Sequence, residues 1–190
     1  MSEAIYIVEY SSIPVGIDTM DRMVKRAPVS IVYAKPVCIG KFLLVLGGEV
    51  GDVRAAQEVV TGAQEKKLMH QYLLTNAHKD ILAYFHRAPS DKADLSGTPA
   101  LGILETRDAT NGFRSLDAAL KSGSVQLEQV WIGHFIGGKF CYILSGQVED
   151  IKTAFEAAVR DLEEKSVVDS RIIPAPNHDT LNYLFKSYQP

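Results

Sequence analysis

Cysteine is scarce in this chain: Cys38 and Cys141 are the two present among 190 residues. Two cysteines are too few for a disulfide framework, and a reducing cytosol would disfavour one. Long hydrophobic runs are also lacking, because none reaches the ~18 residues that a membrane-spanning helix requires. The N-terminal residues show no basic segment followed by an apolar core and a cleavage site, so no secretion signal is indicated. These absences predict a cytoplasmic protein with no membrane partner.

An excess of basic residues is missing as well. The formal net charge is -3 and the isoelectric point is near 5.9. Proteins that bind nucleic acids rely on clustered Lys and Arg to neutralise phosphates, so we predict no nucleic-acid partner. The content of 46% hydrophobic and 23% charged residues is that of a globular protein. The length allows one large domain or two small ones, each with its own core.

Complete catalytic motifs are absent too. Residues 133–139 match the spacing G-x-x-x-x-G-K of a phosphate-binding loop, but Phe140 follows where Ser or Thr should hold magnesium. An apolar strand also follows where a helix N-terminus should meet the phosphate. No serine has the Gly-x-Ser-x-Gly spacing of a nucleophile elbow. We therefore predict that the protein is not an enzyme, and we interpret residues 133–139 as a glycine-rich turn between strands.

What the sequence does contain is an internal repeat. The spacing of apolar residues in the first copy predicts strands at 4–10, 29–33, 42–46 and 68–74, a turn at 13–16, and helices at 17–27, 50–60 and 78–86. Ala100 starts the pattern again at an offset of 96 (100 minus 4) from Ala4. At this offset Gly112, Asp117, Lys121 and Val125 match Gly16, Asp21, Lys25 and Val29. The offset becomes 98 (138 minus 40) after the next loop, which is therefore two residues longer in the second copy.

The repeat divides the chain into two domains. Residues 88–99 are polar and rich in helix- and strand-breaking residues, as expected of a linker. We predict domain 1 at residues 1–90 and domain 2 at residues 98–190. Each is predicted to be an α/β unit, a variant of the ferredoxin-like order β-α-β-β-α-β.

Residues in matching places of the two copies are interpreted as structural. Glu9 and Glu105 match one another at the ends of the first strands. His78 and His178 stand at the start of each copy's last helix, which suggests a shared role such as capping.

Lys25 and Lys121 lie near the C-termini of matching helices. The helix dipole favours a cation there by about 0.3–1 kcal/mol, which is a sufficient structural explanation. The alternative is a lateral contact with a neighbouring molecule, in which the apolar stem lies along its surface and the ammonium group reaches its carbonyl groups. Both interpretations are compatible with the sequence.

Cys38 breaks the repeat. It lies between a proline and a glycine in a predicted loop over residues 34–42, and these two residue types define the backbone that presents the thiol. The second copy has Ile136 or a neighbouring residue in this place. A lone thiol cannot form a zinc or iron–sulfur site, which requires about four ligands, but three Cys38 sulfurs would converge on the axis of a trimer. Cys141 lies inside an apolar strand and is predicted to behave as a small hydrophobe.

Both copies resemble the bacterial microcompartment (BMC) shell domain. The similarity rests on the first strand from Ala100 to Thr106, the helix ending in Lys121, the Gly-Lys pair that opens the next strand and the Gly-(Glu/Gln)-Val that opens the next helix. Two copies in one chain are similar to the tandem-domain, trimer-forming shell proteins. Residues 37–48 also resemble the segment of iron–sulfur-binding tandem shell proteins in which a pore-loop cysteine from each of three subunits ligates a [4Fe-4S] cluster on the threefold axis.

The resemblance implies a homotrimer that forms a pseudohexagonal tile of a microcompartment shell together with other shell proteins. It implies one [4Fe-4S] cluster per trimer, ligated by Cys38, for electron or cluster transfer across the shell. The implied pore-lining residues are Val37, Cys38, Ile39, Gly40, Phe135, Ile136, Gly137 and Gly138. Lys25 and Lys121 are the implied tile-edge residues, although the Pro-Arg-Pro edge motif of many members reads Pro174-Ala175-Pro176 here.

Two alternatives stand beside this interpretation. The tile could contain a metabolite pore without a cluster. A protein of another class, a small-molecule sensor built from tandem ferredoxin-like units, would be a monomer or a dimer, whereas the tile needs three chains.

Overall fold

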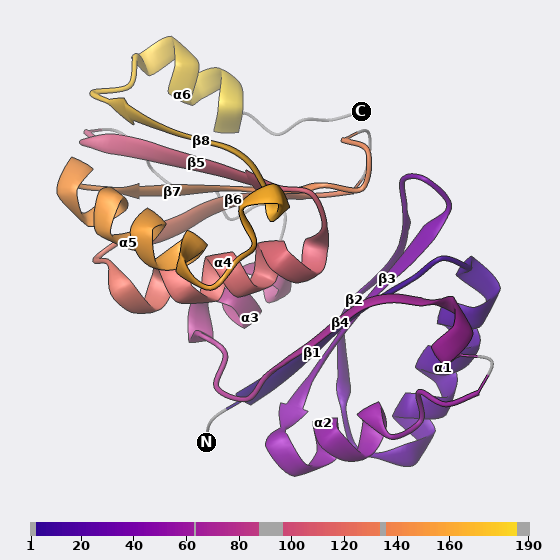
Figure 1. Cartoon of the computed structure of the whole chain (residues 1–190). Helices are drawn as coiled ribbons and strands as arrows, with labels where there is room; N and C mark the ends of the chain where they lie inside the picture. The colour runs from indigo at the N-terminus through magenta and orange to yellow at the C-terminus, as the bar shows by residue number, and fades with distance from the viewer. Residues whose placement is uncertain (1–2, 63, 88–96, 134–135, 186–190) are drawn as a thin grey trace.

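The computed structural model describes residues 3–62, 64–87, 97–133 and 136–185. They form two halves with the same order of elements (Figure 1), termed domain 1 and domain 2 below. Domain 1 contains β1 (Glu3–Tyr10), α1 (Ile13–Arg26), β2 (Ser30–Val37), β3 (Lys41–Glu49), α2 (Val50–Gln57), β4 (Leu68–Leu74) and α3 (Lys79–His86). Domain 2 contains β5 (Ala100–Thr106), α4 (Ala109–Ser122), β6 (Gln126–Ile132), β7 (Phe140–Gly146), α5 (Val148–Arg160), β8 (Val167–Pro174) and α6 (His178–Phe185).

The predicted α/β fold of two tandem units is confirmed. Each domain has a four-stranded antiparallel sheet, with strand orders β2-β3-β1-β4 and β6-β7-β5-β8. Much of the predicted linker, and residue 90 at the end of domain 1, fall within residues 88–96, which lie outside the described part of the chain. The domain boundaries at 90 and 98 therefore stay predictions.

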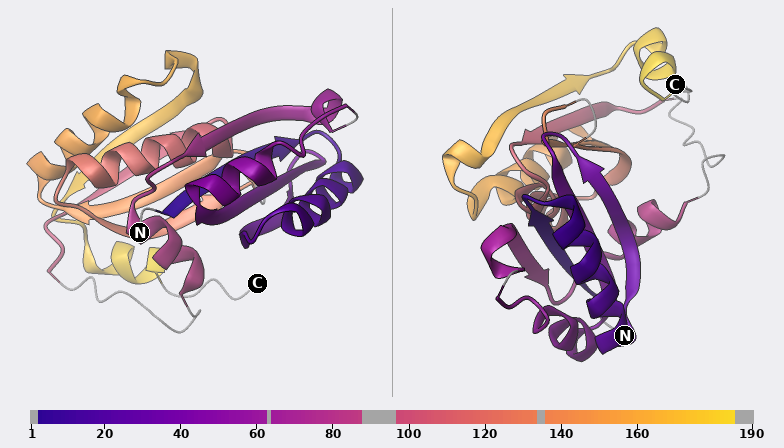
Figure 2. Two further views of the ribbon diagram at one scale, coloured as in Figure 1. Left: turned by 90° about the horizontal axis from the view of Figure 1, so that it is seen from below. Right: turned by 90° about the vertical axis from the view of Figure 1, so that its right-hand side faces the viewer.

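Alternation along β1 directs its side chains into two different cores. Tyr6 and Val8 belong to one core with residues of α1 and α2, whereas Ile5 and Ile7 belong to another with residues of α3. All four are fully buried, because successive strand residues point to opposite faces of the sheet and helices cover both. In domain 2, α4 and α5 cover one face of the sheet and α6 covers the other (Figures 1 and 2).

The two domains share one hydrophobic core. Buried residues of β1, β3 and α3 belong to the same cluster as those of α4, β6 and β7. At the boundary, the rings of Phe85 in α3 and Phe113 in α4 have centroids 5.6 Å apart, and Phe113 lies 4.9 Å from Phe140. An apolar boundary of this kind holds two domains in one arrangement.

Helix bounds and strand register make the two domains equivalent residue by residue. From β1 through β2 the offset is 96, because α1 begins at Ile13 and α4 at Ala109 (109 minus 13). In β3 the offset is 98 (146 minus 48), because Gly48 pairs with Ala4 and Gly146 pairs with the equivalent Ala100. In β4 and α3 it is 99, as the first residues of α3 and α6 show (178 minus 79). The two offsets predicted from the sequence are confirmed.

The turn predicted at residues 13–16 is instead the first turn of α1. Pro14 fits there because a first-turn N–H has no intrahelical partner in any case. Gly16 is needed for packing, since a Cβ atom at this position would lie 2.4 Å from the ring of Phe42.

The predicted capping role holds for His78 and is wrong for His178. The Nδ1 atom of His78 accepts a hydrogen bond from the backbone N–H of Asp80 at 3.4 Å. In domain 2 the side chain of Asn177 accepts from the backbone N–H of Asp179 at 2.8 Å, and α6 begins at His178 itself. The equivalent of His78 is therefore Asn177, at the offset of 99.

Candidate pore site and domain interface

Cys38 occupies a tight turn between β2 and β3. The two strands pair as far as Val37 and Lys41, so the turn comprises residues 38–40. The loop predicted over residues 34–42 is therefore wrong in its extent. Its outer residues are paired backbone of a hairpin, which holds the thiol more closely than a loop of that length would.

Proline and glycine each have a specific place in this hairpin. Pro36 is tolerated because β2 is an edge strand, where one side of the backbone needs no ladder bond. Gly40 has a φ of 69°, a backbone conformation that favours glycine. The prediction that a defined backbone presents Cys38 agrees with this geometry.

The equivalent turn of domain 2 joins β6 to β7, and the offset rises across it from 96 to 98, so this segment is two residues longer than in domain 1, as predicted. Its glycines have positive φ angles: 62° at Gly133, 68° at Gly137 and 80° at Gly138. Strand β7 follows directly, where a phosphate-binding loop would be followed by a helix, so the described residues 133 and 136–139 belong to a connection between strands. Ile136 lies in this turn, whereas the predicted pore residue Phe135 lies outside the described residues.

The two turns contact each other at Cys38. Its backbone N–H donates a hydrogen bond to the carbonyl oxygen of Gly133 at 3.3 Å. A Cβ atom on Gly138 would lie 2.5 Å from the carbonyl oxygen of Cys38, and one on Gly133 would lie 2.5 Å from the Cβ atom of Val37. Both glycines are thus required by close approach as well as by φ. The position of Cys38 is fixed by domain 2 and not by its own hairpin alone.

Cys38 is accessible at this turn. It is partly exposed, the neighbouring Ile39 is 85% exposed, and the cysteine forms no disulfide. Within the described residues of one chain, no three His, Cys, Asp or Glu side chains come together as a metal site.

Cys141 in β7 has a different environment. Burial raises the pKa of its thiol to about 12, and the nearby carboxylate of Glu105 adds to the effect. The thiolate is the reactive form of cysteine, so the raised pKa leaves Cys141 protonated and slow to react. Cys141 is partly exposed, but its raised pKa agrees with the prediction that it has no reactive role.

This difference predicts selective alkylation. Because the raised pKa of Cys141 keeps its thiol protonated, we expect iodoacetamide at pH 8 to modify Cys38 much faster than Cys141, with the rates followed by peptide mass spectrometry of timed samples. The Cys38→Ser variant should lose the fast reaction and keep the slow one. Equal rates at the two cysteines in the folded protein would contradict the assignment.

A buried carboxylate joins the two domains beside the cysteine turn. Glu9, near the end of β1, is fully buried. Its Oε1 atom accepts hydrogen bonds from the backbone N–H and the hydroxyl of Thr110, at 3.0 and 3.1 Å. Thr110 lies in the first turn of α4, where the helix dipole favours a negative charge. The Nζ atom of Lys41 lies 3.7 Å from the other carboxylate oxygen.

Glu105, the equivalent of Glu9, makes a simpler contact. Its carboxylate lies 3.1 Å from the Nζ atom of Lys139 and is partly exposed. Pro14 stands where domain 2 has Thr110 (110 minus 96), and proline has no N–H to donate. The matching Glu and Lys residues of the two copies are the sequence signal for both ion pairs. No comparable signal indicates that Glu9 also binds a helix of the other domain.

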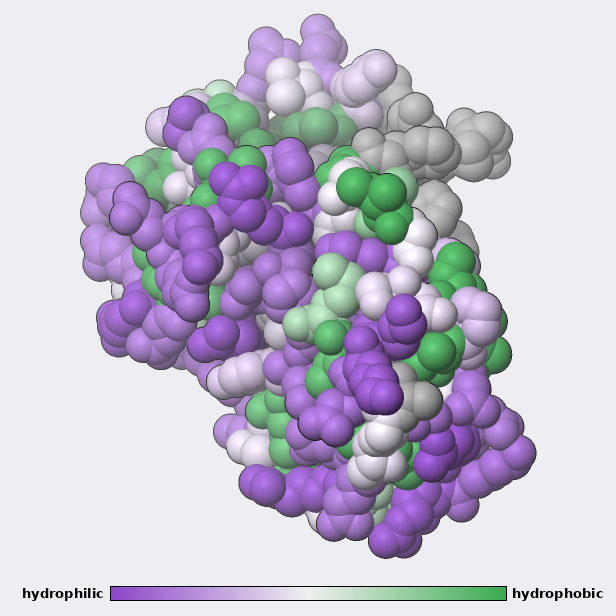
Figure 3. All heavy atoms as spheres, turned by 45° about the vertical axis from the view of Figure 1, so that its right-hand side comes forward, coloured by the Kyte–Doolittle hydropathy of each residue, from purple (hydrophilic) through white to green (hydrophobic). Residues whose placement is uncertain are grey.

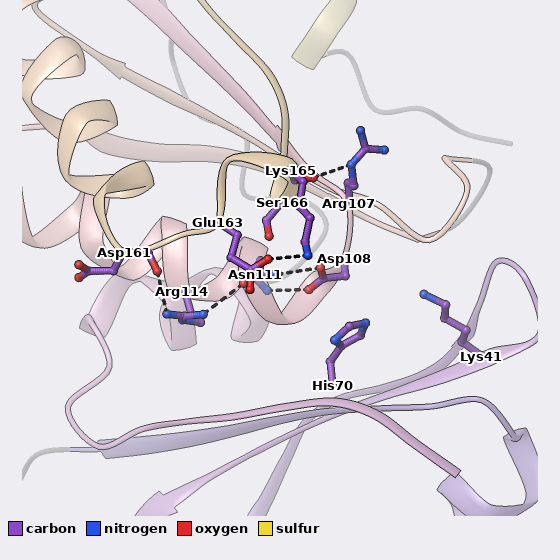
Figure 4. A pocket seen from close by; sticks show the side chains of 10 residues that line it. All are labelled: Lys41, His70, Arg107, Asp108, Asn111, Arg114, Asp161, Glu163, Lys165 and Ser166. Carbon is purple, nitrogen blue, oxygen red and sulfur yellow. Dashed lines mark hydrogen bonds and ion pairs between the residues drawn. The ribbon is translucent and has the colours of Figure 1, made fainter. Parts of the chain in front are cut away.

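A polar cleft of about 700 Å³ opens between the domains near this contact (Figure 4). Lys41 and His70 line it from domain 1. The lining residues from domain 2 are Arg107, Asp108, Asn111, Arg114, Asp161, Glu163, Lys165 and Ser166. Several of these groups are paired with one another, since Arg107 Nε donates to the Lys165 carbonyl at 2.6 Å and Lys165 Nζ lies 2.8 Å from Glu163. A ligand in this cleft would have to compete with those pairs.

The two predicted edge lysines have different surroundings. Lys25 is exposed on α1 and pairs with Asp21 at 2.5 Å. Lys121 pairs with Asp117 at 2.6 Å and also donates to the carbonyl oxygen of Asn76 in domain 1. Lys121 thus makes, inside one chain, the kind of carbonyl contact that the lateral interpretation expects between molecules. A role for either lysine at a tile edge stays a prediction.

Several large apolar side chains are exposed. On the face seen in Figure 3, hydrophobic residues form separate patches among hydrophilic ones. The exposed large hydrophobic residues are Ile17, Val24, Ile31, Ile39, Met69, Trp131, Val159 and Tyr183. Among the described helices, none is both long and apolar enough to cross a lipid bilayer. Exposed apolar patches are typical of surfaces that contact other proteins.

Known proteins match this chain over both domains. The sequence profile of the BMC domain matches residues 4–77 and again residues 100–176. The bacterial microcompartment shell protein PduT of Citrobacter freundii is 35% identical over 178 residues, which cover 93% of this chain and 95% of PduT. The carboxysome assembly protein CcmO of Synechocystis sp. is 28% identical over 84% of this chain and 57% of CcmO.

A solved structure is similar in both domains. The crystal structure of a microcompartments protein from Desulfitobacterium hafniense superposes with a TM-score of 0.85 and 33% sequence identity. The match covers 96% of this chain and 99% of that one. The way in which the two domains pack together is therefore common to both proteins.

Proposed function

The chain belongs to the BMC-domain family of bacterial microcompartment shell proteins, and on this premise we propose that three copies form a tile whose central pore holds a [4Fe-4S] cluster on Cys38. Family membership makes the protein a structural component of the shell that assembles with other shell proteins, and not an enzyme. The observation that carries the finer proposal is the place of Cys38, on a hairpin of domain 1 and against the glycine turn of domain 2.

The chemistry of the donor set fits such a cluster. Iron–sulfur clusters are held by Cys thiolates, and each chain offers one partly exposed thiol that is free of disulfide bonding. Three chains would supply three thiolates, and the fourth iron would take a non-protein ligand. When bound, the cluster supplies one-electron transfer. The role of the protein is to hold the sulfur in place, through the short hairpin and the hydrogen bond from Cys38 to Gly133.

The arrangement of the two turns favours a ring of three chains. Because the Cys38 turn of domain 1 contacts the Gly133 turn of domain 2, successive chains in a closed ring would alternate cysteine turns and glycine turns around one axis. Six domains would then carry three sulfurs. The pore would be lined by residues 38–40 and 136–138, with the exposed Ile39 at the tip of each cysteine turn. Val37, which the sequence also predicts to line the pore, is 5% exposed and belongs to the shared core.

Anaerobic reconstitution with iron and sulfide tests the cluster. We expect the wild-type protein to bind four irons per three chains, to absorb in the visible range and to give an EPR signal after reduction, and the Cys38→Ser variant to do none of these. Cys141→Ser is the matched control, because it removes a thiol that lies within strand β7 and not on the turn, and it should bind iron as the wild type does. Mass measurement in solution should give three chains per particle for all three proteins.

Each alternative predicts a different outcome. Equal iron uptake by the wild type and Cys38→Ser, with the trimer retained, would leave a shell tile with a cluster-free pore. A monomer or dimer at all concentrations would contradict the trimeric tile and would favour the sensor.

A further inference from the structure

We infer that Asp18 of one chain pairs with Arg171 of the next in the trimer. This ion pair would occupy the place between chains that is equivalent to a cation–π contact inside each chain. The inference rests on the proposed trimer and uses the internal repeat as its template. Within one chain, β4 and α3 of domain 1 face α4 and β6 of domain 2. A closed ring of six domains requires β8 and α6 of domain 2 to face α1 and β2 of the next chain in the same way.

The apolar part of this second contact is present and uncovered in the single chain. Phe113 of α4 and Leu127 of β6 lie in the core shared by the two domains and are 0% and 3% exposed. Their equivalents at the offset of 96 are Ile17 of α1 and Ile31 of β2, which are 48% and 46% exposed. The surface that domain 1 covers on domain 2 therefore has an uncovered counterpart on domain 1. Domain 2 of the next chain is the occupant that the repeat indicates.

Helix α6 carries the matching uncovered residue. Tyr84 of α3 crosses the domain boundary inside the chain, where its hydroxyl accepts a hydrogen bond from the backbone N–H of Val130 at 2.9 Å. The equivalent of Tyr84 at the offset of 99 is Tyr183, which is 82% exposed. The equivalent of Val130 is Ala34 (130 minus 96), on the edge strand β2. Tyr183 and Ala34 thus stand in the places that would form this bond between chains.

The chemistry of the two contacts differs where α4 meets β4. Inside the chain, the guanidinium carbon of Arg114 lies 4.5 Å from the ring centroid of Tyr72. The equivalent residues are Asp18 (114 minus 96) and Arg171 (72 plus 99). A cation facing an aromatic ring is replaced by a carboxylate facing a cation. Both partners differ together, and the contact between them is attractive in each case.

Local pairing leaves both charges available to the next chain. Asp18 accepts a hydrogen bond from Gln64 at 3.1 Å and lies 4.0 Å from Arg22. Arg171 pairs with Asp169 at 2.6 Å. The side chains of Asp18 and Arg171 are 60% and 72% exposed, and such surface pairs contribute little. A contact between two copies of domain 2 would place Arg114 against Arg171, and one between two copies of domain 1 would place Asp18 against Tyr72. Neither is attractive, so these residues favour domain 1 beside domain 2.

Charge reversal with rescue tests this pair. Asp18→Arg or Arg171→Glu would place like charges at each of the chain–chain contacts that close the ring. We expect either variant to raise the concentration at which half of the chains are trimeric by about tenfold or more, and the double variant to return it to within about threefold of wild type. Sedimentation equilibrium over a dilution series measures this concentration.

Glu149→Arg is the matched control. Glu149 is an exposed acid on α5 with a basic partner on its own helix, Lys152, at 2.7 Å. Its equivalent in domain 1, Gly51 (149 minus 98), has open space around its Cβ position, so it lies outside the contact between domains inside the chain. Glu149 should likewise lie outside the contact between chains, and Glu149→Arg should leave the trimer unchanged. Single variants as trimeric as wild type, or a double variant no better than the weaker single one, would overturn the ion pair with the trimer intact. A wild-type chain that does not form trimers would overturn the trimer and the pair together.

Discussion

Replacing Glu9 by alanine is expected to lower the free energy of unfolding by about 3–5 kcal/mol, the cost of removing one partner from a buried charged contact. The loss leaves the backbone N–H and the hydroxyl of Thr110 without their acceptor at the first turn of α4. It also leaves Lys41, whose side chain is 18% exposed, without its carboxylate. A buried donor without an acceptor is costly because it has lost its hydrogen bonds to water and forms none within the protein.

Urea unfolding followed by circular dichroism measures this effect, at one protein concentration because association stabilises folded chains. Glu105→Ala is the matched control. Glu105 has the equivalent place in domain 2, but its pair with Lys139 is partly exposed and Pro14 replaces the helix donor. This variant should cost less than about 1 kcal/mol. Equal losses in the two variants would show that the contact with α4 contributes nothing.

Replacing Gly112 by alanine is expected to destabilise the protein by about 1–3 kcal/mol through overpacking. A Cβ atom at this position in α4 would lie 2.2 Å from the Cγ atom of Phe140, which is fully buried at the start of β7. Phe140 also contacts Phe113 in the shared core. The ring cannot move away without disturbing the residues that join the two domains.

Gly51→Ala is the control of opposite sign. Gly51 lies in α2 with nothing within 4 Å of its Cβ position. Alanine there restricts the unfolded chain without a clash and should stabilise by about 0.4–1 kcal/mol. Thermal unfolding of both variants separates helix propensity from packing. A stabilised Gly112→Ala variant would contradict the close approach of α4 to Phe140.

Most of the fold could be predicted because one pattern occurs twice. Apolar alternation and helical spacing are local signals, and each was supported by its counterpart in the other copy. The errors lie where a local signal has two meanings. Pro14 is compatible with a turn and with the first turn of a helix. The match of His78 with His178 assumes an offset of 100, one more than the offset of 99 found in β4 and α3.

The sequence indicated which residues belong to the candidate site, but it did not predict the length of the turn or its contacts. Proline and glycine around Cys38 indicate a constrained turn, but pairing of β2 with β3 sets its length. The hydrogen bond from Cys38 to Gly133 joins residues 95 positions apart (133 minus 38). No local pattern predicts such a contact, because it depends on how two completed domains pack.

The amino-acid sequence alone was sufficient for the tandem α/β fold, for the single cysteine turn that the second copy lacks and for the family resemblance, because these depend on residues close together in the chain or on a comparison of its two halves. The packing of the folded domains decided which surfaces meet. Glu9 and Glu105 are the same residue type at the same strand position, yet Glu9 is buried on Thr110 of the neighbouring helix and Glu105 is partly exposed. The neighbouring element determines this difference, since it supplies hydrogen-bond donors to Glu9 and excludes water from it.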